Sequence, residues 1–80
     1  MLEYMVNYFD NKPDAKKESR RLEDCLEKLG VAQHLGGSPG GNMTQFSLKT
    51  EHDEAQVRRV LTRLQLQGSW TLNQREEENA

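Results

Sequence analysis

The sequence predicts an α+β domain in which a four-stranded antiparallel sheet carries two helices on one face. Two stretches, one from Pro13 to Leu29 and one from Asp53 to Gly68, place apolar residues at the spacing of an amphipathic helix. Each is flanked by shorter stretches rich in aromatic and β-branched residues, which is typical of strands. With 80 residues, the chain has room for a single small core. The predicted order is strand, helix, strand, strand, helix, strand.

The first strand is predicted over Leu2–Phe9, where aromatic and β-branched residues are dense. Four side chains alternate onto one face, namely Leu2, Tyr4, Val6 and Tyr8. Met5 and Phe9 make the opposite face partly apolar as well. A strand that is apolar on both faces favours a central position in the sheet.

The first helix is predicted to begin at Pro13, because the missing N–H of proline needs no partner in a first helical turn. Its apolar stripe is formed by Ala15, Leu22, Cys25, Leu26 and Leu29. Gly30 is expected to end the helix in a left-handed conformation. Because Cys25 lies on the apolar stripe, we interpret it as a small buried hydrophobe.

A hairpin is predicted in the middle of the chain. Its arms are Val31–Leu35 and Met43–Thr50, the second with Phe46 and Leu48 on one face. The seven residues between them, 36–42, contain four glycines and a proline, which break either regular pattern. This segment lacks the Gly-Lys-Ser/Thr ending of a phosphate-binding loop. We interpret it as a mobile hairpin tip, and a loop that orders on a partner is the functional alternative.

The second helix is predicted to begin with a capping box of Asp53 and Gln56, with Thr50 and Asp53 as the competing pair. Its apolar stripe is formed by Val57, Val60, Leu61 and Leu64. Gly68 is expected to end the helix, and Ser69–Leu72 is expected to form a short closing strand.

This order of elements predicts a ferredoxin-like βαββαβ sandwich. Right-handed crossovers would place the first and third strands in the centre of the sheet. The domain is expected to span residues 1–73, followed by a disordered acidic tail over residues 74–80. Because so small a core gives little net stability, a homodimer formed through the open sheet face or an edge strand is a further hypothesis. Met5 and Phe9 are the expected contributors on that face.

Composition excludes several classes of protein. No apolar run approaches the roughly 20 residues of a membrane helix, and the first residues do not resemble a secretory signal. A single cysteine excludes an intrachain disulfide, so we expect a cytoplasmic protein. The net charge of −2 comes from residues 75–80, without which the 11 basic and 13 acidic residues become ten of each. A neutral body argues against a dedicated binder of duplex nucleic acid.

Two groups of cations are candidate contact sites. Basic residues gather near the start of the first helix, namely Lys12, Lys16, Lys17, Arg20 and Arg21, and a second strip holds Arg58, Arg59 and Arg63. Cations are unfavourable at the helix end that prefers anions, which indicates a partner, although a solvated face is the simpler interpretation. The candidate partner-binding residues are Gly36, Gly37, Ser38, Gly40, Gly41, Arg20, Arg21, Arg58 and Arg59.

Asp10 ends the first strand and has two interpretations. Aspartate and asparagine form turns by hydrogen bonding to their own backbone, which accounts fully for Asp10 and Asn11. Alternatively, a carboxylate at the end of a central strand lies beside the same carboxylate of a second subunit in a dimer, and the two hold one divalent cation, Mg²⁺ or Mn²⁺. Such an ion would support phosphodiester cleavage.

Three segments carry a resemblance to known proteins, namely Tyr4–Asp10, Leu26–Gly30 and Phe46–Leu48. In layout the chain resembles the CRISPR-adaptation small nuclease family and its relatives, the virulence-associated protein D and SinR-like families. The resemblance implies a ferredoxin-like homodimer with metal-dependent nuclease activity, in which Asp10 is the metal ligand. In that family the aspartate usually follows a tyrosine directly, whereas Phe9 intervenes here.

Other roles of this fold class need motifs that the sequence lacks. A heavy-metal chaperone needs Cys-x-x-Cys, and a zinc site needs about four ligands, whereas Cys25, His34 and His52 have no paired spacing. The first and third strands lack the exposed aromatic and basic set of an RNA-recognition sheet. The leading hypothesis is a non-catalytic module without a cofactor that docks on a protein partner as a regulator or inhibitor, of the kind encoded by phages and mobile elements. The alternatives are the Asp10 nuclease and a non-catalytic nucleic-acid binder.

Overall fold

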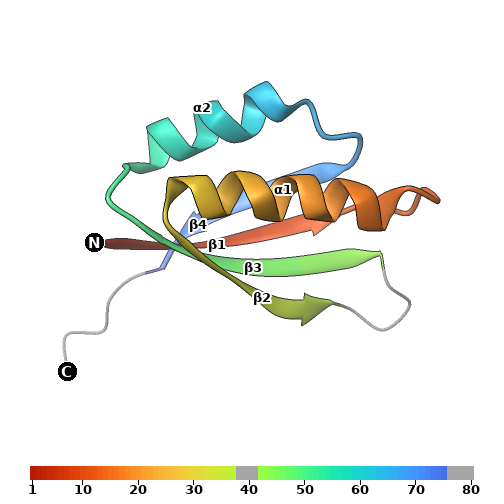
Figure 1. Ribbon diagram of the computed structural model, residues 1–80, viewed down its shortest axis with the longest axis horizontal. Coiled ribbons are helices and arrows are strands. Elements are labelled where there is room, and N and C mark those ends of the chain that lie inside the picture. Colours follow the sequence, from red (N-terminus) through yellow and green to blue (C-terminus); the bar gives the residue numbers. More distant parts are fainter. Residues whose placement is uncertain (38–41, 76–80) are drawn as a thin grey trace.

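The computed structural model describes residues 1–37 and 42–75, and its elements follow the predicted order (Figure 1). They are β1 (Leu2–Phe9), α1 (Ala15–Leu29), β2 (Val31–Gly37), β3 (Met43–Thr50), α2 (Glu54–Leu64) and β4 (Ser69–Gln74). This is the βαββαβ order of the ferredoxin-like fold, so the predicted fold class is confirmed. Within the described part of the chain, no helix has both the length and the apolar character needed to cross a membrane.

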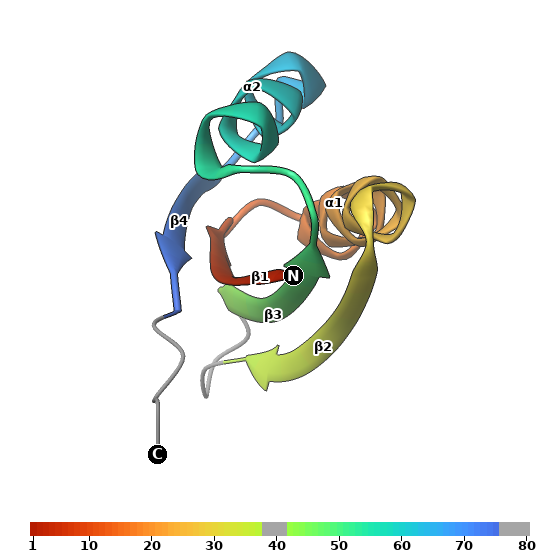
Figure 2. The ribbon, with the colours of Figure 1, turned by 90° about the vertical axis from the view of Figure 1, so that its left-hand side faces the viewer.

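The four strands form one antiparallel sheet in the order β2-β3-β1-β4, so β1 and β3 are central, as predicted. On β1, Val6 lies opposite Phe46 of β3 on one side and Leu72 of β4 on the other. α1 packs against β2 and β3, whereas α2 packs against β4. Figure 2 shows both helices on the same side of the curved sheet.

The core follows the alternation of the central strand. Tyr4, Val6 and Tyr8 point toward the helices and are buried. They pack with residues of the helices and the neighbouring strands, namely Leu22, Leu26, Phe46, Leu48, Val57, Leu61 and Leu72. Cys25 packs half-buried against this cluster, in keeping with its interpretation as a small hydrophobe. On the open side of the sheet, Phe9 is 43% exposed.

Two glycines that were expected to end helices in a left-handed conformation have another role. Gly30 is extended, with a φ of 175°, and a Cβ there would overlap the carbonyl oxygen of Lys49 on β3. Gly68 lies beyond α2, and a Cβ there would overlap the carbonyl oxygen of Phe9. Gly30 does end α1 as its C-cap, but the left-handed conformation predicted for it is wrong, and the prediction that Gly68 ends α2 is wrong because Gln65 is the C-cap. Each glycine is required by the close approach of another strand.

Both helices are shorter than predicted. α2 ends at Leu64, and Gln65 takes the left-handed cap position with a φ of 50°. α1 begins at Ala15, because Pro13 lies in a preceding turn that is closed by the Ala15 amide and the Lys12 carbonyl at 3.1 Å. The fixed φ of proline suits the second position of such a turn as well as it suits a helix start.

β2 continues through Gly36 and Gly37, which the sequence assigned to the irregular tip. The register with β3 shifts between His34 and Gly36, which leaves Leu35 as the extra residue of a bulge. Gly36 has a φ of 119°, a conformation that residues with side chains rarely adopt. The prediction for these two glycines is wrong, because glycine here permits a bulge and does not end the strand. The other predicted tip residues, Ser38, Gly40 and Gly41, lie outside the described residues.

Asp53 is the N-cap of α2 and forms the predicted capping box with Gln56. The Asp53 carboxylate accepts from the Gln56 amide at 2.8 Å, and the Gln56 side chain accepts from the Asp53 amide at 3.0 Å. The competing pair with Thr50 is not formed, because the Thr50 hydroxyl donates to the carbonyl of Leu29 at 2.8 Å. Thr50 thereby connects the end of β3 to the end of α1.

The folded domain extends past residue 73. β4 reaches Gln74, and the Arg75 amide donates to the carbonyl of Glu3 at 2.8 Å. Two residues of the predicted acidic tail therefore belong to the sheet edge. Residues 76–80, the remainder of that tail, lie outside the described residues.

Asp53→Ala should lower the free energy of unfolding by about 1 kcal/mol, because it removes the side-chain acceptor of the Gln56 amide. Urea denaturation followed by circular dichroism measures the change. Asp24→Ala is the matched control, since Asp24 is exposed on α1 and no hydrogen bond or ion pair joins its side chain to a described residue. Equal stability of the two variants would show that the capping box contributes nothing.

Candidate binding site

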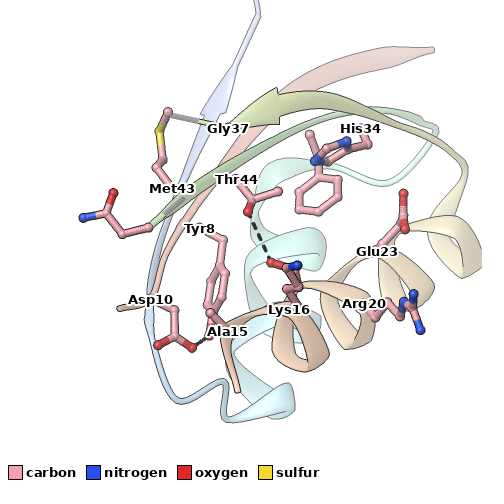
Figure 3. Close-up of a pocket in the computed structure, with 13 residues that line it drawn as sticks. Tyr8, Asp10, Ala15, Lys16, Arg20, Glu23, His34, Gly37, Met43 and Thr44 are labelled. Atoms are coloured by element: carbon pink, nitrogen blue, oxygen red, sulfur yellow. Dashed lines mark hydrogen bonds between the residues drawn. The ribbon is translucent and has the colours of Figure 1, made fainter. Parts of the chain in front are cut away.

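A cavity of about 430 Å³ lies between the first half of α1 and the strands β2 and β3 (Figure 3). Its volume falls within the range of ligand sites in proteins, roughly 300–1,000 Å³. Tyr8, Met43 and Phe46 supply an apolar floor from the sheet, and Lys16 and Arg20 line the cavity from α1. The cavity thus combines an apolar surface with two cations, Lys16 and Arg20, and two carboxylates, Asp10 and Glu23.

The wall contributed by α1 is charged. Lys16, Arg20 and Glu23 stand at positions i, i+4 and i+7 on one stripe of the helix. Lys16 and Arg20 are exposed, and neither side chain has an ion pair with a described residue. Glu23 is the one acidic side chain that α1 contributes to the cavity. Both cations are therefore available to a ligand.

The start of α1 adds to the positive potential. Asp14 occupies the N-cap position, but its side chain makes no capping hydrogen bond. The acidic residue of the first turn, Glu18, is engaged by Arg21, whose guanidinium donates to the two carboxylate oxygens at 3.0 and 2.9 Å. Because the first turn of a helix carries partial positive charge, an anion is favoured beside Lys16.

Two contacts hold the walls of the cavity in place. The His34 ring of β2 packs against the Phe46 ring of β3, with 5.4 Å between the ring centroids. The Ser19 hydroxyl of α1 donates to the Thr44 hydroxyl of β3 at 3.3 Å (Figure 3). Because these contacts form within the chain, a ligand finds the site already shaped, which lowers the entropic cost of binding.

Asp10 lies at one end of the cavity and is 7% exposed. Its carboxylate accepts three hydrogen bonds, one from the Lys12 amide at 2.9 Å and two at 2.7 Å, from the Tyr8 hydroxyl and the Gln67 side-chain amide. Burial by itself would raise the pKa of Asp10, but these donors outweigh burial and hold the pKa below its ordinary value of 3.8. The carboxylate is therefore ionised at neutral pH.

The same network fixes Tyr8. Its hydroxyl donates to Asp10 and accepts from the Gly68 amide at 3.0 Å. Burial and the hydrogen bond to the Asp10 carboxylate raise the pKa of Tyr8 to about 12. The bond from the Lys12 amide to Asp10, two residues earlier, is the turn-forming contact of the first interpretation of Asp10.

The residues around Asp10 do not fit the metal site of the second interpretation. Both carboxylate oxygens already accept hydrogen bonds from the same chain. Across residues 1–37 and 42–75, no three histidine, cysteine, aspartate or glutamate side chains gather to hold a metal ion. Mg²⁺ or Mn²⁺, which prefer several oxygen ligands, would have to displace the Lys12, Tyr8 or Gln67 donor from Asp10.

The four arginines predicted to bind a partner lie in different surroundings. Arg20 lines the cavity, whereas Arg59 is exposed on α2 away from the cavity. Arg21 is engaged within the chain, because besides its bonds to Glu18 it donates to the carbonyl of Leu64 at 2.9 Å. It thereby caps the last turn of α2 and joins the two helices.

Arg58 is also engaged within the chain. Its guanidinium donates to the carbonyl of Leu72 on β4 at 3.3 Å and lies 5.8 Å from the centroid of a Trp70 ring. Glu54, one helical turn earlier, lies 3.7 Å from it. Arg58 therefore connects α2 to β4, although its side chain stays half-exposed.

Of the cavity lining, sequence reasoning singled out Asp10, Lys16, Arg20 and Gly37, and it missed the other residues, among them Glu23, His34 and Phe46. The spacing of Lys16, Arg20 and Glu23 was a usable signal, because it marks one helical stripe beside the apolar stripe. The placement of His34 over Phe46 had no such signal, since it depends on the register of β2 with β3. Of the predicted glycines, Gly37 lines the cavity.

Comparisons with protein-family models, with curated proteins and with solved structures find no match. What the chain does is therefore inferred from its own residues.

Asp10→Asn should lower the free energy of unfolding at pH 7 by about 2 kcal/mol, because the amide replaces one of the two acceptor oxygens by an NH2 donor and removes the negative charge that the three donors contact. The pH dependence should change as well. A carboxylate whose folded pKa lies below its unfolded pKa stabilises the protein above the unfolded pKa, and this contribution is lost as pH falls through the folded pKa. Urea unfolding followed from pH 7 to well below pH 4 should therefore show a steeper loss in wild type than in the variant once the pH falls below the ordinary Asp pKa of 3.8.

Asp14→Asn is the matched control for this experiment. Asp14 is exposed and makes no capping hydrogen bond, so the variant should keep the acid response of wild type. If Asp10→Asn also kept that response, the Asp10 network would contribute nothing to stability.

Proposed function

We propose that this chain is a small non-catalytic module that binds a protein partner in the cytoplasm and acts as a regulator or inhibitor. Its docking site is the cavity between α1 and the β2–β3 hairpin. The observation that carries the proposal is the pair of available cations, Lys16 and Arg20, beside the uncapped start of α1 and next to an apolar floor. A protein segment with acidic and apolar side chains complements both features.

A binding role is favoured over catalysis by the titration of the cavity residues. A general acid or base acts best when its pKa lies near the working pH. The two cavity residues with shifted pKa values are both shifted away from neutrality, Asp10 below its ordinary value and Tyr8 to about 12. Burial and the bond to Asp10 raise the pKa of Tyr8, whereas the Lys12, Gln67 and Tyr8 donors lower the pKa of Asp10 against the effect of burial. These contacts support a structural role.

A protein partner is favoured over nucleic acid by charge. Nucleic-acid affinity comes largely from neutralising several phosphates, and the chain carries a net charge of −2. Two of the four candidate arginines, Arg21 and Arg58, already donate to carbonyl oxygens of the same chain. The cations left at the cavity, Lys16 and Arg20, suit one or two carboxylates.

Charge reversal of both cavity cations should weaken capture of the partner at least about tenfold, the loss expected when a favourable charge contact becomes repulsive. The full-length chain is immobilised and exposed at moderate salt to lysate of the source, with and without nuclease treatment. The captured proteins are quantified by mass spectrometry. Wild type and Lys28→Glu should capture the same protein, whereas Lys16→Glu combined with Arg20→Glu should lose it. Lys28 is the matched control, because it is exposed in the last turn of the same helix.

Three outcomes of this experiment contradict the proposal. A protein captured equally by all three chains would exclude the cavity as the docking site. Capture that disappears with nuclease treatment would identify a nucleic-acid binder. Recovery of no stoichiometric protein by wild type would exclude the binding module.

The nuclease alternative makes a separate prediction. We expect wild type with Mg²⁺ or Mn²⁺ to cleave DNA and RNA no faster than Asp10→Asn does, since the Asp10 carboxylate is engaged by three donors. Cleavage is measured on labelled single-stranded and duplex substrates, and circular dichroism checks the fold of the variant. Metal-dependent cleavage that is lost in a folded Asp10→Asn would establish the nuclease instead.

A further inference from the structure

We propose that the partner contributes an extended segment of alternating acidic and apolar residues, which adds a fifth strand at the outer edge of β2. The acidic side chains lie on the α1 side, beside Lys16 and Arg20, and the apolar side chains lie on the open side, beside Val31 and Leu35. This rests on the proposed function and defines how the partner occupies the same site.

β2 is an edge strand with little protection. It lies at one end of the sheet and contains neither a charged residue nor a proline. Natural proteins usually protect exposed edges with charges, proline or a covering segment, because unpaired backbone groups recruit other strands. Val31 and Leu35 are 65% and 43% exposed. The bulge at Leu35 is the one protective feature, and it leaves Val31–His34 as a regular edge.

The antiparallel ladder defines which backbone groups of β2 face outward. The Arg75 amide donates to the Glu3 carbonyl, so the odd-numbered residues of β1 bond to β4 and the even-numbered ones bond to β3. By the same alternation, the even-numbered residues of β3 direct their backbone N–H and C=O groups toward β1, and the odd-numbered residues of β3 direct theirs toward β2. Ala32 and His34 pair with even-numbered residues, so their N–H and C=O groups face the outer edge. No backbone bond joins them to another described segment.

The opposite edge of the sheet is covered. On β4 the outward-facing carbonyl of Leu72 accepts from Arg58, whose guanidinium also lies over Trp70. A strand added to β4 would have to displace this side chain, which Glu54 helps to position. Among the described residues no side chain donates to the backbone of β2 in this way. The added strand is therefore assigned to β2.

The two faces of β2 define the chemistry of the added strand. Paired residues on adjacent strands direct their side chains to the same face. His34 and Gly37 both line the cavity, so partner residues beside them face α1. The wall beside His34 carries Glu23, whereas Lys16 and Arg20 lie nearer the start of α1, and it is there that a carboxylate is favoured (Figure 3). Val31 and Gln33 lie on the other face and are followed by the exposed Leu35 of the bulge, and apolar partner residues would cover Val31 and Leu35. The resulting acidic–apolar alternation has the two-residue period of a strand.

The probe is a fluorescein-labelled peptide of alternating valine and glutamate, about ten residues long, the length of an ordinary strand with flanks. Fluorescence anisotropy with the full-length chain measures its Kd. Ala32→Pro removes an outward N–H without removing a ladder bond to β3, and it should weaken binding about tenfold. Gln74→Pro is the matched control, since it removes an outward N–H from the β4 edge, and it should bind as wild type does.

Charge is tested in the same assay. Lys16→Glu combined with Arg20→Glu should weaken binding at least about tenfold and flatten its salt dependence, because exposed ion pairs are screened by salt. Lys28→Glu should bind as wild type does, and a peptide of alternating valine and lysine should not bind wild type.

Amide hydrogen exchange of the wild-type chain gives a readout that does not depend on the folding of any variant. Exchange at Ala32 and His34 should slow at least about tenfold when the valine–glutamate peptide saturates the chain, because both amides gain acceptors. Unchanged exchange at both amides, or tight binding by a folded Ala32→Pro, would overturn strand addition. If capture of a protein partner still depended on Lys16 and Arg20, the proposed function would stand without it.

A second copy of the chain is the remaining occupant of this edge. Sedimentation of wild type as a dimer that Ala32→Pro converts to a monomer would assign the edge to self-association and overturn the proposal. A monomer for both is the expected result.

Discussion

The hydrogen bonds that converge on the Asp10 carboxylate hold together the three segments that meet at the end of β1. Tyr8 belongs to the central strand, Lys12 to the turn that leads into α1, and Gln67 to the loop that precedes β4. A buried carboxylate without partners would cost several kcal/mol, so the fold depends on all three segments staying in place. Gly68 permits this arrangement, because only a residue without a side chain lets the loop approach the end of β1 so closely. β1 pairs with both β3 and β4. The position of its end therefore determines where α1 begins and where the chain comes back from α2 into β4.

The network that stabilises the end of β1 also forms a rigid boundary for the cavity. On the other side of that cavity, α1 begins without a side-chain cap and carries Lys16 and Arg20 in its first half, choices that lower the intrinsic stability of a helix. α2, by contrast, begins with a complete capping box. Sequences give up local helix stability most often at functional sites. The uncapped, cation-rich start of α1 and the fully capped start of α2 differ in this way.

The arginines have different structural roles that the sequence does not distinguish. Arg21 caps the end of α2 and Arg58 covers the edge of β4, so both stabilise contacts between elements. Arg20, next in sequence to Arg21, turns to the cavity because adjacent helical residues point about 100° apart. The consequence is an asymmetric sheet. One edge is covered by a side chain of the same chain, and the other edge, β2, presents its backbone beside the cavity that Lys16 and Arg20 line.

The sequence by itself determined the six elements, the central position of β1 and β3, and the capping box at Asp53, because hydrophobic alternation, helical spacing and an i, i+3 hydrogen bond are encoded within a few residues. Only the tertiary structure decided why Gly30 is a glycine, since the reason is a carbonyl of Lys49 on another strand. It also supplied a hydrogen-bond donor to Asp10 that no local pattern could reveal, because Gln67 arrives from the far end of the chain. The cavity belongs to the same category: its walls are distant in sequence, and the register of β2 with β3 brings them together. Local patterns specify which elements form, whereas the contacts that give a side chain its role arise only when those elements pack.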